Sequence, residues 1–78
     1  MKANIKYFGM IAEKMGKTEE IYELEFSGKL NLREYFLKKD ARLQDMNFQI
    51  AVNKTLTEVI TNDLNSVEIA LLPPFAGG

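Results

Sequence analysis

The sequence predicts an α+β domain in which a mixed β-sheet is covered on one face by one main helix. Four segments alternate apolar and polar residues with the period of a half-buried strand, namely 3–8, 20–26, 48–53 and 67–72. One segment, 32–39, has the apolar spacing and the end signals of an amphipathic helix. Because a single helix covers only one face of a sheet, packing of the helix on one face is the expected arrangement.

The N-terminal part is expected to form two antiparallel strands. Ala3, Ile5 and Tyr7 share the inward face of the first strand, which leaves Phe8 on the opposite face. Residues 9–16 are interpreted as a loop with a helical turn at most, and the turn after Gly16 leads into the second strand. The inward face of the second strand consists of Tyr22, Leu24 and Phe26.

The main helix is expected between Leu32 and Lys39. Asn31 is a favourable N-cap, and Glu34 follows it three residues later in a capping-box pattern. Apolar side chains then fall on one side of the helix at Leu32, Tyr35 and Phe36. The segment 40–47 that follows is interpreted as a polar loop, with Leu43 and Met46 as its contacts with the core.

The C-terminal half is expected to complete the sheet. Asn53 and Lys54 form a turn after the strand at 48–53, and residues 55–60 are expected to be a short edge strand. In the last strand the residues alternate between the two faces. Those expected to face inward are Val67, Ile69 and Leu71, and those expected to face outward are Glu68, Ala70 and Leu72.

Length and composition point to one small domain without the common side-chain chemistries. The chain has 78 residues, of which 46% are hydrophobic and 27% charged. It contains neither Cys nor His, so disulfides, thiol nucleophiles, Ser-His triads and the usual zinc sites are excluded, and no metal site is predicted. The net charge of −1 and the lack of a basic cluster argue against nucleic-acid binding. Without a signal peptide or a membrane-length apolar run, we expect a cytoplasmic protein that binds no membrane.

The chain ends in a segment that differs from the rest, and we divide it into a domain of residues 1–72 and a tail of residues 73–78. Pro73 and Pro74 cannot donate to a strand ladder, and their fixed φ favours an extended backbone. Gly77 and Gly78 carry no side chains, so the terminal carboxylate is sterically open. Taken alone, this ending also fits an ordinary frayed terminus.

Three stretches of the sequence share a pattern with a known family. Residues 67–78 read Val-Glu-Ile-Ala-Leu-Leu-Pro-Pro-Phe-Ala-Gly-Gly, in which the double proline before Gly-Gly is the most specific feature. Residues 5–9, Ile-Lys-Tyr-Phe-Gly, and residues 50–53, Ile-Ala-Val-Asn, agree as well. Over essentially its whole length the chain resembles the small subunit of molybdopterin synthase, a MoaD-like, ubiquitin-related sulfur carrier. The resemblance implies a β-grasp fold with the first and last strands adjacent at its centre. If these two strands pair in parallel, Lys6 lies near Glu68, and a cross-strand ion pair between them is expected.

The resemblance also implies a chemistry for the tail. Gly78 would be the reacting residue: an activating enzyme related to the ubiquitin-activating enzymes converts its carboxylate with ATP into an acyl-adenylate, and sulfur then replaces the adenylate. The thiocarboxylate donates sulfur to a cyclic pyranopterin phosphate and so builds the molybdopterin dithiolene. Pro73, Pro74, Phe75, Ala76 and Gly77 would guide Gly78 into the partner's active site.

Two partners follow from the same resemblance: the adenylyltransferase and the large subunit of molybdopterin synthase, in a heterotetramer. The chain would be a sulfur-donating subunit without catalytic side chains of its own, and it would bind no cofactor. Phe8 and Leu72 both fall opposite the buried faces of their strands, so adjacent strands would place them in one apolar patch beside the tail. Phe8, Leu72 and Phe75 are therefore the predicted partner-binding residues, with Phe75 as an aromatic anchor.

Three alternatives remain open from the sequence. In the first alternative the chain is a related carrier that supplies sulfur for the thiazole of thiamine. In the second it is a ubiquitin-like modifier that forms isopeptide bonds with protein lysines. In the third alternative it is a binding module with an inert tail. The double proline at the start of the tail favours the molybdopterin branch over the first alternative.

Overall fold

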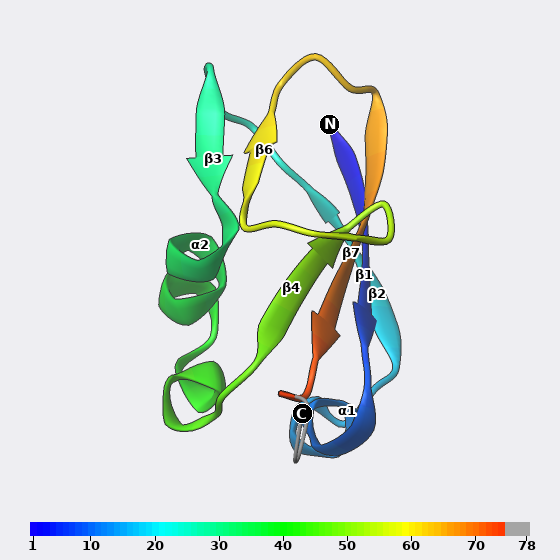
Figure 1. The fold of residues 1–78 in the computed structure, drawn as a ribbon, viewed down its shortest axis with the longest axis vertical. Coiled ribbons are helices and arrows are strands. Elements are labelled where there is room, and N and C mark those ends of the chain that lie inside the picture. The colour runs from blue at the N-terminus through cyan, green and yellow to red at the C-terminus, as the bar shows by residue number, and fades with distance from the viewer. Residues whose placement is uncertain (75–78) are drawn as a thin grey trace.

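The structure is a computed structural model that describes residues 1–74, and it has the predicted α+β architecture. Its main sheet has five strands in the order β2-β1-β7-β4-β5. Their bounds are β1 Lys2–Tyr7, β2 Glu19–Glu23, β4 Gln49–Val52, β5 Thr55–Leu56 and β7 Ser66–Leu72. The first and last of these strands, β1 and β7, pair in parallel at the centre of the sheet, and the remaining pairs are antiparallel (Figure 1).

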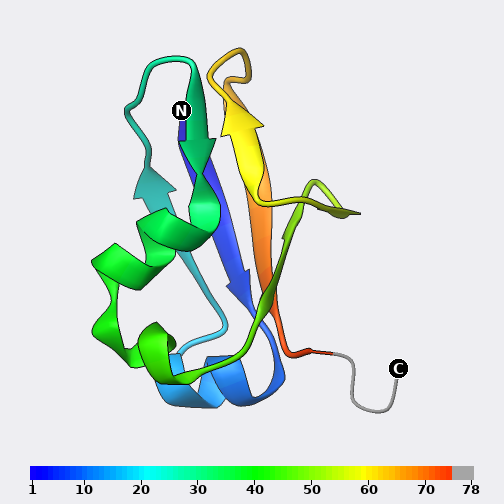
Figure 2. The same ribbon diagram turned by 60° about the vertical axis from the view of Figure 1, so that its left-hand side comes forward.

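One face of this sheet, the covered face, carries the hydrophobic core. Helix α2 (Leu32–Lys39) and a 3-10 helix, η1 (Ala41–Asp45), lie over it, and none of the helices within residues 1–74 lies on the opposite, outer face (Figure 2). Among the most buried side chains are Ile5, Ile69 and Leu71 of the central strands, together with Leu32, Phe36 and Leu43 of the helical layer. The inward residues predicted for the first and last strands are therefore confirmed.

Helix α2 begins where its cap predicts. The Oδ1 atom of Asn31 accepts a hydrogen bond from the backbone N–H of Glu34 at 3.0 Å, which satisfies one of the free donors of the first turn. Leu32 and Phe36 are buried, and Tyr35 packs partly against the core. Because an eight-residue helix is unstable alone, this apolar side holds it on the sheet.

The interpretation of residues 9–16 as a loop was wrong, because they form helix α1 (Gly9–Met15) at the end of the sheet (Figure 1). Its N-cap residue, Phe8, makes no side-chain cap, so the usual start signal is missing. Ile11 and Met15, one turn apart, are both buried. Gly16 ends the helix in the left-handed conformation, with φ of 74°.

Two further expectations are corrected in the middle of the chain. Residues 55–60 do not form one edge strand: after β5 the chain enters β6 (Val59–Thr61), which pairs with a strand the sequence did not predict, β3 (Lys29–Asn31). Thr57 and Glu58 lie between β5 and β6, and Arg33 of α2 binds both carboxylate oxygens of Glu58, at 3.0 and 2.8 Å. The segment 40–47 is not a loop throughout, since it contains η1, whereas the expected contact of Leu43 and Met46 with the core is confirmed: Leu43 is fully buried and Met46 packs against the core.

Candidate functional site

The main hollow beside the tail lies on the outer face of the sheet. We call it the outer-face groove; its volume is about 500 Å³. Four segments contribute to it: β1 and the residue after it, β7, β4, and the turn into β5 with β5 itself. Its lining consists of Lys6, Phe8, Ala51, Lys54, Leu56, Glu68, Ala70 and Leu72. It is formed by outward positions of the same strands that build the core on their other side.

Phe8 and Leu72 meet at the end of the groove where the tail begins. The β1–β7 register aligns Tyr7 with Leu71, and the backbone N–H of Phe8 donates to the carbonyl of Leu71 at 3.2 Å. Phe8 and Leu72, which follow this aligned pair, are therefore neighbours on the outer face. Phe8 is 44% exposed and Leu72 is half-buried. The structure brings these two predicted residues together, as alternation combined with the expected adjacency of the two strands required.

The rest of the groove combines apolar and charged groups. Leu56 is exposed on the far side, while Lys6 and Glu68 form an ion pair at 3.1 Å across β1 and β7, as the sequence led us to expect. Lys54 lies in a turn whose two residues both have positive φ, 49° for Asn53 and 72° for Lys54. Asn53 fixes this turn to β7, since its Oδ1 accepts a hydrogen bond from the N–H of Glu68.

The root of the tail bends away from the line of β7. The strand ends at Leu72, and the chain then leaves on the side of the sheet away from α2 (Figure 2). Pro73 is half-buried against Gly9, and Pro74 is exposed. Both prolines also border a smaller hollow of about 280 Å³, shared with Met10, Ile11 and residues 45–47. Of the predicted guide and anchor residues, Phe75, Ala76, Gly77 and Gly78 lie outside the described residues.

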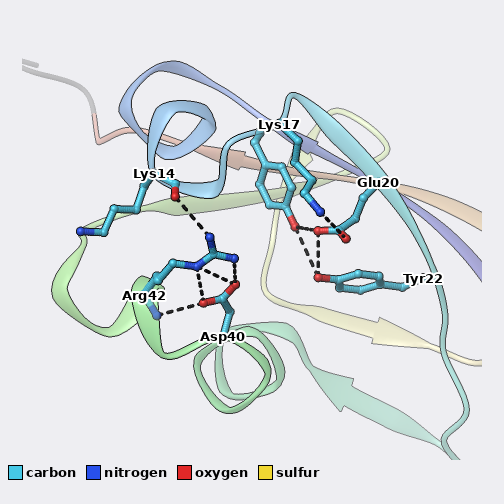
Figure 3. A network of polar contacts seen from close by, with 7 residues as sticks. Lys14, Lys17, Glu20, Tyr22, Asp40 and Arg42 are labelled. Carbon is cyan, nitrogen blue, oxygen red and sulfur yellow. Dashed lines mark hydrogen bonds and ion pairs between the residues drawn. The ribbon is translucent and has the colours of Figure 1, made fainter.

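A polar network that the sequence analysis missed lies at the β2 edge of the covered face (Figure 3). Glu20 accepts hydrogen bonds from the hydroxyls of Tyr7, at 2.6 Å, and of Tyr22, at 3.1 Å, and from Lys17 at 3.2 Å. Burial alone raises the pKa of Glu20, but these hydrogen bonds outweigh it and hold the pKa below its ordinary value of 4.5. Burial and the bond to Glu20 raise the pKa of Tyr7 above its ordinary 10.0.

The network is structural rather than catalytic. Glu20 stays ionised and Tyr7 stays protonated near neutral pH, so neither is poised to exchange a proton. Figure 3 also shows a separate neighbouring pair, in which Arg42 binds Asp40 and lowers the pKa of its carboxyl. The signal for Glu20 was present, because an acidic residue occupies a position in phase with the inward Tyr22 and Leu24.

The described residues offer little for catalysis or metal binding. Within residues 1–74, no group of three Asp or Glu side chains is placed to hold a metal ion. None of the helices in that range is long and apolar enough to cross a membrane. What the site does offer is an apolar groove with charged groups beside the start of the tail, a kind of surface that often marks a binding site.

Fold and site together define a ubiquitin-like β-grasp domain whose last central strand leads directly into the tail. No family model matches the chain, and no curated protein matches it. Solved structures do match, and the identities of those described below, 16 to 23%, make this a likeness of fold.

The structural neighbours include two proteins of molybdopterin conversion. A protein assigned as molybdopterin converting factor, subunit 1, from Pyrococcus furiosus is similar at a TM-score of 0.74 and 21% identity, over 96% of this chain and 99% of that one. One chain of the complex between subunits 1 and 2 of the molybdopterin-converting factor from Helicobacter pylori is similar at a TM-score of 0.66 and 23% identity, over the full length of both chains. SAMP1 from Haloferax volcanii is similar at 0.74 and 16%, also over the full length of both.

Proposed function

We propose that this chain is a sulfur carrier and the small subunit of a molybdopterin synthase. The observation that carries the proposal is the position of the outer-face groove: it lies at the root of a tail that ends in Gly77-Gly78. A partner that covers Phe8 and Leu72 is thereby placed where it can receive the tail. The fold shared with molybdopterin converting factor subunit 1 supports the same function.

The proposed reaction takes place at the carboxylate of Gly78, in the cytoplasm. A carboxylate oxygen attacks the α-phosphorus of ATP in the adenylyltransferase and displaces pyrophosphate. A sulfur nucleophile then attacks the acyl carbon, AMP leaves, and a thiocarboxylate remains. In the large subunit, the thiocarboxylate sulfur forms a C–S bond with a side-chain carbon of the cyclic pyranopterin phosphate and displaces an oxygen from that carbon. Water then cleaves the acyl–sulfur bond, which restores the carboxylate of Gly78 and leaves a thiolate on the pyranopterin, and a second carrier molecule supplies the second sulfur of the dithiolene. Adenylation is needed because the oxygen of a free carboxylate is a poor leaving group.

The domain's task in this proposal is binding and orientation. The apolar part of the outer-face groove gives the partner a surface to cover, and the Lys6–Glu68 pair and Lys54 give that surface a charge pattern. Acid, base and phosphate-binding groups come from the partners, in keeping with a chain that has no His and no Cys. The complex of subunits 1 and 2 known for the Helicobacter pylori factor is the precedent for a large-subunit partner.

The first test is the intact mass of the chain after incubation with ATP, sulfide and an adenylyltransferase of this type. We expect the gain of one sulfur-for-oxygen exchange, located in the C-terminal fragment, and no gain for the chain lacking Gly78. A chain that gains no sulfur contradicts every carrier reading. Transfer to the pyranopterin with the large subunit then separates molybdopterin formation from thiazole formation, and a conjugate to a lysine identifies a protein modifier.

The second test concerns the groove. Phe8→Ala should weaken the complex with the large subunit about tenfold, since an apolar side chain in an interface centre contributes on the order of 1–2 kcal/mol. Ile21→Ala is the matched control: Ile21 is 62% exposed on the same face but lines a different hollow, and its loss should leave affinity unchanged. Isothermal titration calorimetry measures both. Equal effects of the two substitutions would contradict the assignment of the groove.

A further inference from the structure

We infer that Gly9 is a positioning residue, which sets the direction in which the tail leaves the sheet. It does so by leaving space for the ring of Pro73. The kinetic consequence drawn below rests on the proposed function, whereas the geometric part does not.

The ring of Pro73 occupies the place where a side chain at position 9 would lie. A Cβ atom added to Gly9 would stand 2.9 Å from Cγ of Pro73 and 3.8 Å from its Cδ. The first distance is shorter than two carbon atoms tolerate without moving apart. Gly9 also has φ of +55°, which lets the chain turn from β1 directly into α1 beneath the ring. The glycine is thus required both for the turn and for the clearance.

The contact lies at the point where the chain leaves the sheet. Leu71 is fully buried, and its carbonyl accepts the hydrogen bond from Phe8, so β7 is fixed up to that point. Pro73 is half-buried on Gly9, and Pro74 is exposed. Because each proline holds its φ near one value, a rotation imposed at Pro73 is passed on to the residues that follow.

An alanine at position 9 should therefore redirect the tail without removing any group that a partner recognises. The β1–β7 ladder and the outer-face groove would remain, so the partner would still bind. The carboxylate of Gly78 would arrive displaced, and a misplacement of about 1 Å at a reacting atom costs up to about a hundredfold in rate.

The chain offers matched controls. Gly16 lies at the other end of α1 with φ of +74°, and a Cβ there would meet no atom within 4 Å, so Gly16→Ala reproduces the backbone strain without the clash. Pro73→Ala removes Cγ and Cδ, the two atoms that a Cβ at position 9 would meet. The double variant Gly9→Ala/Pro73→Ala then carries the strain at position 9 without the clash.

The geometric arm is an NMR experiment on the full chain. In the parent we expect nuclear Overhauser effects between the Hα protons of Gly9 and the ring protons of Pro73. Gly9→Ala should shift the Pro73 resonances while those of the buried Ile69 stay in place, and Gly16→Ala should leave Pro73 unchanged. A parent without these effects, or Pro73 resonances unmoved in Gly9→Ala, would overturn the inference whatever the protein's function.

The kinetic arm measures thiocarboxylate formation with ATP, sulfide and the adenylyltransferase. We expect Gly9→Ala to lower kcat by about tenfold or more with KM for the carrier within about twofold, the pattern of misplaced reacting groups. Gly16→Ala should match the parent, and Gly9→Ala introduced into the Pro73→Ala chain should change kcat by less than about threefold, because the ring that it would displace is absent. A kcat for Gly9→Ala equal to the parent's, or a loss from Gly9→Ala that is as large in the Pro73→Ala chain as in the parent, would each refute the inference. A parent that gains no sulfur refutes the proposed function instead and leaves the NMR arm intact.

Discussion

The covered and outer faces of the central strands are formed by alternate residues of the same two segments, β1 and β7. On the covered face, Ile5, Ile69 and Leu71 are completely buried under the helical layer. On the outer face, Ala70 and Leu72 are only half-buried and Phe8 is exposed, although all three are apolar. The difference shows that one strand pair has two unlike faces: the covered face stabilises the fold, and the outer face leaves apolar side chains accessible, which is the surface that we propose a partner covers.

Neighbouring leucines give the largest contrast between the faces. Leu71→Ala should lower the free energy of unfolding by about 2–5 kcal/mol, because a fully buried side chain is lost and a cavity remains. That is a large part of the roughly 5–15 kcal/mol by which a small domain is stable. Leu72→Ala should cost less than about 1 kcal/mol and instead weaken partner binding. Urea denaturation followed by circular dichroism measures the stability of both variants, and equal losses of stability would show that the two faces do not differ.

Alternation made this contrast predictable from the sequence. The register of β7 follows from three apolar residues at every second position, and helix α2 follows from Asn31 and its spacing. Both signals are local. The position of the groove followed from them, because Phe8 and Leu72 had to share the outer face once β1 and β7 were adjacent. That adjacency came from the family resemblance and not from the alternation.

The elements that were not predicted depend on distant parts of the chain. Strands β3 and β6 have three residues each, too few for a clear alternation, and they exist because each pairs with the other across some thirty residues of sequence. Helix α1 lacks a side-chain cap and begins at a glycine, so its stability comes from the burial of Ile11 and Met15 at the end of the sheet. The contact of Gly9 with Pro73 likewise joins the two ends of the chain and has no local signature.

Acid should destabilise the folded protein through a group at the covered face of the sheet. Glu20 has a depressed pKa in the folded protein, so its ionised form contributes stability at pH values above its ordinary 4.5, and that stability is lost as pH falls through the folded pKa. Glu20→Gln should lower stability at neutral pH by about 1–2 kcal/mol and reduce the loss on acidification. Chemical denaturation at a series of pH values tests this. The exposed neighbour variant Glu19→Gln is the control, and a pH profile of Glu20→Gln parallel to the parent's would contradict it.

The smallest effect is expected for the ion pair on the outer face. Lys6 and Glu68 lie 3.1 Å apart with side chains 39% and 34% exposed, so water screens their attraction. A double-mutant cycle of Lys6→Ala and Glu68→Ala should give a coupling below about 1 kcal/mol that diminishes in high salt. A larger coupling that persists in salt would mean that the outer face also stabilises the fold. If the small coupling is found but both single variants weaken the complex with the large subunit, the pair acts in recognition, because the charges then matter only where a partner covers them and excludes water.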